Sequence, residues 1–128
     1  MRLLSALLIT GAVLLIPLTV ASAAPKSGPF VGNWTAIDKF DDSNLTLVVK
    51  GQGAGKHPIT LFDDRATACG GGTATAKDVG TVTGNVLSAT LKVKCANGSF
   101  VPDTPYTFTY DPSTGKLTDS YGVVWSRA

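Results

Sequence analysis

The chain has 128 residues, of which 11 are Lys or Arg, nine are acidic and one is His, and every acidic residue is Asp. With the N-terminal Arg2 set aside, basic and acidic side chains nearly balance, which excludes the strongly basic surface that nucleic acids and anionic lipids require. Asp favours turns, and the many Thr, Val and Gly residues favour strands over helices. The composition therefore predicts an all-β protein.

The N-terminus has the pattern of a secretory signal peptide. A positive start is followed by an uncharged apolar run from Leu3 to Val20 and then by small residues. The run approaches the length of a membrane span, but Pro17 and the small residues after the run favour cleavage. We expect a signal peptide over residues 1–23, removed after Ala23, and a secreted, extracellular product with no stable membrane span.

The rest of the chain is long enough for one domain with a modest core. We expect a flexible N-terminal arm over residues 24–29 and a single domain over residues 30–128. The two cysteines, Cys69 and Cys95, predict a disulfide because secretion places them in an oxidising environment. Together with the single His57 they cannot complete a four-ligand zinc site, so we expect no metal and no cofactor.

Strand candidates follow one another at short spacing, separated by turn residues, which is typical of a β-sandwich or a small barrel. Gly84 and Asn85 predict a tight hairpin, because such turns need positive φ. The most regular candidate, Val86–Cys95, alternates strictly between apolar and polar side chains, so one of its faces is buried. In chain order, the candidates are Phe30–Ile37, Asn44–Lys50, Ile59–Asp63, Thr73–Lys77, Val79–Thr83, Val86–Cys95, Pro105–Tyr110, Lys116–Asp119 and Gly122–Arg127.

An open sheet built from these strands leaves unpaired edges, whereas a sheet that closes on itself has none. We therefore expect a single antiparallel up-and-down β-barrel of about eight strands. The alternative is a two-sheet β-sandwich. Neither arrangement requires a helix.

The first strand candidate carries Gly32-x-Trp34, which resembles the G-x-W signature of calycin barrels, the group that contains lipocalins and avidins. The stretch GNWTAIDKFDDSNLTL is also similar to the opening of avidins, but nothing matches the further lining of a biotin pocket. The resemblance implies that Trp34 plugs one end of the barrel, that Arg127 stacks over it, and that Gly32 leaves room for this approach. The whole chain also looks like small secreted bacterial β-domain proteins with no assigned function.

An aromatic set near the end of the chain is the candidate ligand-binding surface. It consists of Tyr106, Phe108, Tyr110 and Trp125. Such side chains pack in a core, or they line a barrel mouth, where Tyr and Trp combine a flat apolar face with a polar tip. Because Trp34 is expected to close one end, we expect the ligand at the opposite mouth or in the loops.

Aspartates cluster at two places in the chain. Asp38, Asp41 and Asp42 lie in the first predicted turn, and Asp63 and Asp64 in a later predicted loop. Paired carboxylates can hydrolyse glycosides or hold calcium. The first turn lacks the D-x-D-x-D-G spacing and the distal Glu of a calcium loop. We interpret these residues as solvated turn aspartates, with calcium binding at the first turn left open.

Nothing in the sequence assembles into an enzyme active site. His57 is predicted to lie in a solvated glycine-rich loop, and no G-x-S-x-G nucleophile motif occurs. We therefore expect a monomeric, non-enzymatic binding protein for a small ligand or an extracellular macromolecule, with no nucleic-acid partner. The alternatives are a secreted protease inhibitor acting through its N-terminal arm or loops, and a hydrolase that uses the loop aspartates.

Overall fold

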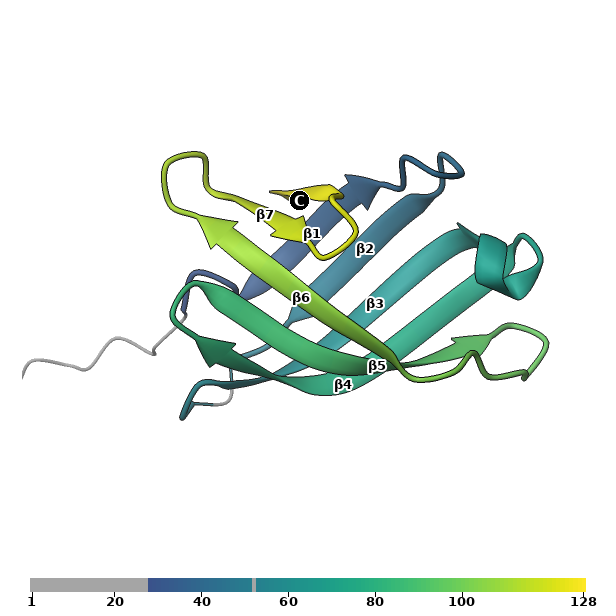
Figure 1. Ribbon diagram of the computed structural model, residues 1–128, viewed down its shortest axis with the longest axis horizontal. Helices are drawn as coiled ribbons and strands as arrows, with labels where there is room; N and C mark the ends of the chain where they lie inside the picture. Colours follow the sequence, from purple (N-terminus) through teal and green to yellow (C-terminus); the bar gives the residue numbers. More distant parts are fainter. Residues whose placement is uncertain (1–27, 52) are drawn as a thin grey trace, which may run out of the picture.

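A computed structural model describes residues 28–51 and 53–128 and shows eight antiparallel strands that close into one barrel in sequence order (Figure 1). This confirms the predicted all-β, up-and-down barrel over the sandwich. The strands are β1 (Gly32–Ile37), β2 (Asn44–Val49), β3 (Lys56–Ala66), β4 (Gly72–Thr83), β5 (Val86–Cys95), β6 (Thr104–Asp111), β7 (Lys116–Asp119) and β8 (Val124–Arg127). A short 3-10 helix, η1 (Thr67–Cys69), follows β3.

The barrel closes where the first strand meets the last. β1 pairs with β8 through Trp34 opposite Arg127 and Thr35 opposite Ser126. The predicted signal peptide and the first four residues of the predicted arm, 24–27, lie outside the described residues. Among the residues that are described, no helix is long and apolar enough to cross a membrane.

β3 and β4 are longer than the sequence predicted. The two short candidates after Thr73 form the single strand β4, and β3 extends at both ends beyond the predicted Ile59–Asp63. The reason is their mutual pairing, which runs from Lys56 opposite Thr81 to Ala66 opposite Gly72 and overrides the weak strand propensity of small and charged residues. As a consequence, the predicted loop after Asp63 is wrong at Asp64, because β3 continues through this residue.

The hairpin between β4 and β5 follows the prediction. Gly84 and Asn85 connect the two strands, and Gly84 has a φ of 60°. Asn85 is not among the residues with positive φ, so the turn has the type II′ pattern, with Gly at the first central position.

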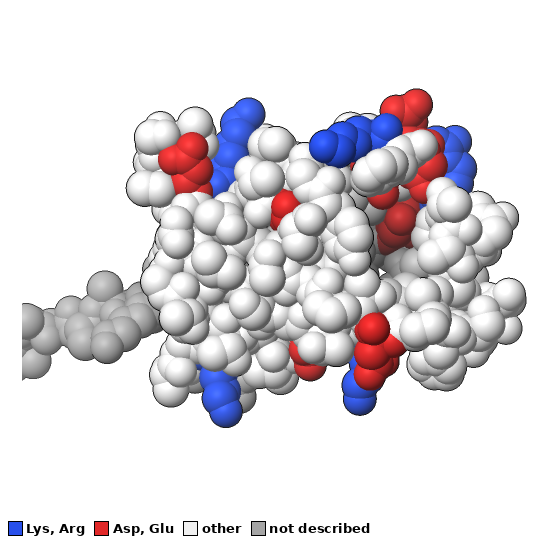
Figure 2. All heavy atoms as spheres, in the orientation of Figure 1, with Lys and Arg blue, Asp and Glu red and all other residues white. Residues whose placement is uncertain are grey.

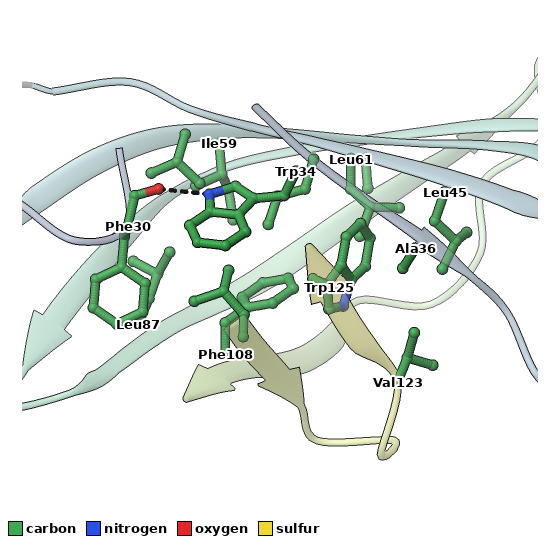
Figure 3. Packing of buried hydrophobic residues seen from close by; sticks show 14 of the residues in the cluster. Phe30, Trp34, Ala36, Leu45, Ile59, Leu61, Leu87, Phe108, Val123 and Trp125 are labelled. Carbon is green, nitrogen blue, oxygen red and sulfur yellow. Dashed lines mark hydrogen bonds between the residues drawn. The ribbon is translucent and has the colours of Figure 1, made fainter. Parts of the chain in front are cut away.

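Strand alternation places the core inside the barrel. In β5, Leu87, Leu91 and Cys95 are buried while Ser88 and Lys92 are exposed, as the strict alternation predicted. The largest fully buried side chains are Trp34, Trp125, Phe30 and Phe108, which lie close together inside the barrel (Figure 3).

The up-and-down order gives the barrel two different ends. The loops over residues 38–43, 67–71, 96–103 and 120–123 belong to one end, called the open end below; the first three lie toward the right in Figure 1. The predicted disulfide is confirmed: it joins Cys69 of η1 to Cys95, the last residue of β5. The opposite end, where Trp34 and Arg127 lie, is called the closed end.

Candidate ligand-binding site

The closed end is sealed by Trp34 and Arg127. The Arg127 Cζ atom lies 4.3 Å from the centroid of the Trp34 ring, and its Nη1 and Nη2 donate hydrogen bonds to Val31 O (2.9 Å) and Pro29 O (2.6 Å). Trp34 Nε1 donates to Phe30 O at 2.8 Å (Figure 3). A Cβ on Gly32 would come within 2.7 Å of Arg127 Nη1, so glycine leaves the room that this stacking needs. Side chains therefore fill this end.

His57 also belongs to the interior toward the closed end, and its predicted place in a solvated loop is wrong. Inward positions of β3 alternate, so His57 is buried together with Ile59 and Leu61. His57 Nδ1 lies 2.9 Å from Lys50 O. The histidine is therefore held by the backbone and lies at the end of the barrel away from the open-end loops.

The structure separates the four aromatic residues that the sequence grouped. Phe108 and Trp125 are fully buried and pack edge to face, with ring centroids 5.8 Å apart. Tyr110 contacts Phe30 toward the closed end, with ring centroids 6.1 Å apart. Of the four, Tyr106 alone lines the cavity described next. One face of β6 carries Tyr106, Phe108 and Tyr110 as predicted, but that face runs the length of the barrel and does not form one surface.

The open end contains a cavity of about 390 Å³, called the open-end cavity below. Its inner wall includes Leu61 of β3, Ala74 and Ala76 of β4, and Leu91 of β5. The space exists because inward positions of β4 carry alanine here, whereas Trp34 and Phe108 fill the interior nearer the closed end. Figure 2 shows a hollow toward the right of the molecule with acidic residues, drawn in red, on its wall.

Two tyrosines from different elements form one side of the cavity. The rings of Tyr106 and Tyr121 have centroids 4.9 Å apart and are tilted by 48°. Burial, foremost, raises the pKa of Tyr106, with a further contribution from the nearby carboxylate of Asp119. Sequence reasoning missed Tyr121, because it stands in the β7–β8 loop and belongs to no alternating pattern.

Asp119, which the sequence analysis did not single out, holds the β7–β8 loop and this side of the cavity. Its Oδ1 accepts hydrogen bonds from the backbone N–H groups of Tyr121 and Val123, each at 2.9 Å. Its Oδ2 accepts from Trp125 Nε1 at 3.0 Å and from the Tyr106 hydroxyl at 3.4 Å. The carboxylate is buried, and its four donors explain how it is tolerated there. The sequence feature that could have indicated this role is an Asp directly before a Ser-Tyr-Gly turn.

The other wall of the cavity carries three aspartates. Asp38, Asp41 and Asp63 each place one carboxylate oxygen within 4.8 Å of those of the other two, and we call them the acidic cluster. Asp42, predicted to join the first two, is exposed and is not part of this group. Asp64 instead binds the side chain of Asn44 at 2.7 Å, and hydrogen bonds from that asparagine lower the Asp64 pKa.

Short hydrogen bonds hold the acidic cluster in place. Asp38 Oδ1 accepts from the backbone N–H of Phe40 at 2.8 Å, and Asp63 Oδ1 from that of Arg65 at 2.9 Å. Asp41 accepts from the backbone N–H of Ser43 at 3.0 Å and from the Thr67 hydroxyl at 2.6 Å. These bonds, that from the Thr67 hydroxyl foremost, lower the pKa of Asp41 from 3.8 to about 2.

The sequence analysis missed the acidic cluster because it grouped Asp63 with Asp64, at the end of a strand candidate, and not with the first turn. In β3, Asp63 follows Leu61 at the next inward position, and Leu45 of β2 pairs with it across the sheet. The register therefore brings Asp63 beside the first turn, which carries Asp38 and Asp41. The alternation of inward side chains that begins at Ile59 could have placed Asp63 on the inner face of the barrel.

Comparisons with models of protein families, with curated proteins and with solved structures found no match to the chain. No residue role is therefore transferred from a relative. The functional argument below depends on the geometry of the open-end cavity and on the sequence features already described.

Proposed function

We propose that this chain is a secreted, non-enzymatic binding protein of calycin-like type that takes a small, largely apolar ligand into the open-end cavity. The signal-peptide pattern over residues 1–23 and the disulfide between Cys69 and Cys95 support secretion. The G-x-W motif at Gly32 and Trp34, together with the eight-stranded barrel, supports the calycin-like relationship.

The observation that carries the proposal is the asymmetry of the barrel interior. Trp34 and Arg127 fill one end, while the other end retains a cavity of about 390 Å³. Ligand cavities are typically about 300–1,000 Å³, mostly apolar, with a few polar groups that orient the ligand. Apolar side chains such as Leu61, Leu91 and Val93 dominate this wall, so burial of apolar ligand surface provides the driving force.

The chain offers a direct way to fill this cavity. Ala76 is almost fully buried in the cavity wall, and a leucine there would extend into the cavity. Thr75, the preceding residue of β4, has the opposite orientation and does not line the cavity, so Thr75→Leu is the matched control. Both variants add one large apolar side chain to the same strand.

The test uses the protein purified from the medium after secretion and the uncharged fluorescent probe N-phenyl-1-naphthylamine. We expect saturable binding to the wild type and to Thr75→Leu, with at least about tenfold weaker binding to Ala76→Leu. Thermal midpoints measured on each variant show that the barrel is intact. Equal binding to all three proteins, or no binding of the probe and no co-purified mass in native mass spectrometry, would rule out the proposal.

A further inference from the structure

The charge of the cavity wall restricts what the ligand is. Asp38, Asp41 and Asp63 line the cavity, and no Lys, Arg or His of the described residues does. Two cations lie nearby, and each donates a hydrogen bond to a backbone oxygen. Arg65 Nη2 donates to the Asp41 carbonyl at 2.9 Å, and Lys39 Nζ to the Gly122 carbonyl at 3.1 Å.

The acidic cluster also has hydrogen-bonding capacity to spare. Each of its members uses Oδ1 to accept one backbone N–H from its own loop or strand end. The second oxygens of Asp38 and Asp63 accept no hydrogen bond from the residues that the structure describes. These two oxygens therefore remain as acceptors, and both residues line the cavity wall.

The aromatic side of the cavity favours the same kind of ligand. Tyr106 and Tyr121 present rings 4.9 Å apart on the cavity wall, and Phe40 lines its mouth. The faces of aromatic rings attract cations, ammonium groups in particular. A cation that lies between the tyrosines and the acidic cluster would interact favourably with both.

The size of the cavity favours an organic cation over a bare metal ion. A calcium ion takes about six to eight oxygen ligands, and the acidic cluster supplies three carboxylates whose Oδ1 atoms are already hydrogen-bonded. An ion there would also leave the apolar wall of Leu61, Ala76 and Leu91 without a partner.

We propose that the ligand of the open-end cavity is a small organic amine, with its ammonium group on Asp38 and Asp63 and its apolar body against the inner wall. This inference rests on the proposed function, because it specifies the ligand of the same cavity. Charge attraction then adds selectivity to the affinity that apolar burial provides.

The test compares three ligands of similar shape and different charge. They are 1-naphthylmethylamine, which is a cation at pH 7, 1-naphthalenemethanol, which is neutral, and 1-naphthoate, which is an anion. Calorimetry on the secreted protein should give about tenfold tighter binding for the amine than for the alcohol, and the weakest binding for the anion. Added salt should weaken the binding of the amine and leave that of the alcohol nearly unchanged.

Substitutions then assign the selectivity to the acidic cluster. The double variant Asp38→Asn/Asp63→Asn removes two charges and keeps an amide oxygen at each position for the existing hydrogen bonds. It should bind the amine about tenfold more weakly and the alcohol as the wild type does. Asp42→Asn is the matched control, because Asp42 is exposed in the same loop and outside the cavity lining. If the double variant unfolds, Asp63→Asn alone serves the same comparison.

The outcomes separate this inference from the proposed function. Equal binding of amine and alcohol to the wild type would contradict the proposal that the ligand is an organic amine, but it would still agree with an apolar binding site in the cavity. Failure of all three ligands to bind would count against the proposed function itself. Suppose instead that the wild type binds calcium, that the double variant does not, and that the amine is not preferred. This result would contradict the amine proposal and identify a metal ion as the ligand of the acidic cluster.

Discussion

The closed and open ends of the barrel follow the same strand alternation and differ in the side chains that alternation turns inward. At the closed end, Phe30 and Trp34 fill the interior, and Arg127 covers it. At the open end, the inward positions include Ala74 and Ala76, and the carboxylates of the acidic cluster line the cavity. The comparison indicates that large side chains pack at one end and leave a cavity at the other, where we propose that the ligand binds.

The largest expected effect is at the closed end. Trp34→Ala should lower the free energy of unfolding by about 3–5 kcal/mol, because it removes a fully buried indole and leaves a cavity. Urea denaturation followed by circular dichroism measures this loss. A loss below about 1 kcal/mol would contradict the view that this end carries the packing.

The disulfide is the main covalent support of the open end. Replacing both Cys69 and Cys95 by Ala should cost about 3–4 kcal/mol, because the bond closes a loop with a sequence separation of 26. The same denaturation experiment, with wild type under reducing conditions as the control, checks this value. An unchanged unfolding midpoint would show that the open end is held by packing alone.

The Arg127 cap should contribute less than the indole beneath it. Arg127→Gln removes the cation–π contact with Trp34 and the paired hydrogen bonds to Pro29 and Val31. We expect a loss of about 1–2 kcal/mol, because the side chain is exposed and water replaces part of its interactions. Binding at the open-end cavity should stay as in the wild type, and weaker binding would mean that the two ends are coupled.

The smallest effect concerns the acidic cluster and depends on pH. Because hydrogen bonds lower the pKa of Asp41 from 3.8 to about 2, this group stabilises the fold above about pH 4. That contribution is lost as the pH falls through about 2. Thr67→Val removes the strongest of these bonds, so it should lower the thermal midpoint at pH 7 and have a diminishing effect between pH 4 and pH 2. A difference that is the same at every pH would contradict this account.

Local patterns in the sequence were sufficient to predict an all-β chain, most of its strands and one hairpin. The alternation from Leu87 to Cys95 predicted a strand with one buried face, and turn residues at Gly84 and Asn85 predicted the hairpin that the structure has. These features depend on the period of a strand and on the conformational freedom of glycine, which are properties of neighbouring residues. The pairing of Cys69 with Cys95 followed from their number and from the expected secretion.

The candidate site was decided by contacts between residues distant in the chain. Asp63 joins Asp38 and Asp41 only through the register of β2 on β3, and Tyr121 meets Tyr106 only through the turn that Asp119 holds. Likewise, Phe108 and Ala76 both face inward because of strand alternation, but alternation does not determine which end of the barrel each residue occupies. Within the strands that it predicted, the sequence by itself determined which side chains share a face, because that depends on strand period. Only the closed barrel decided how much space they leave, because volume depends on all strands at once.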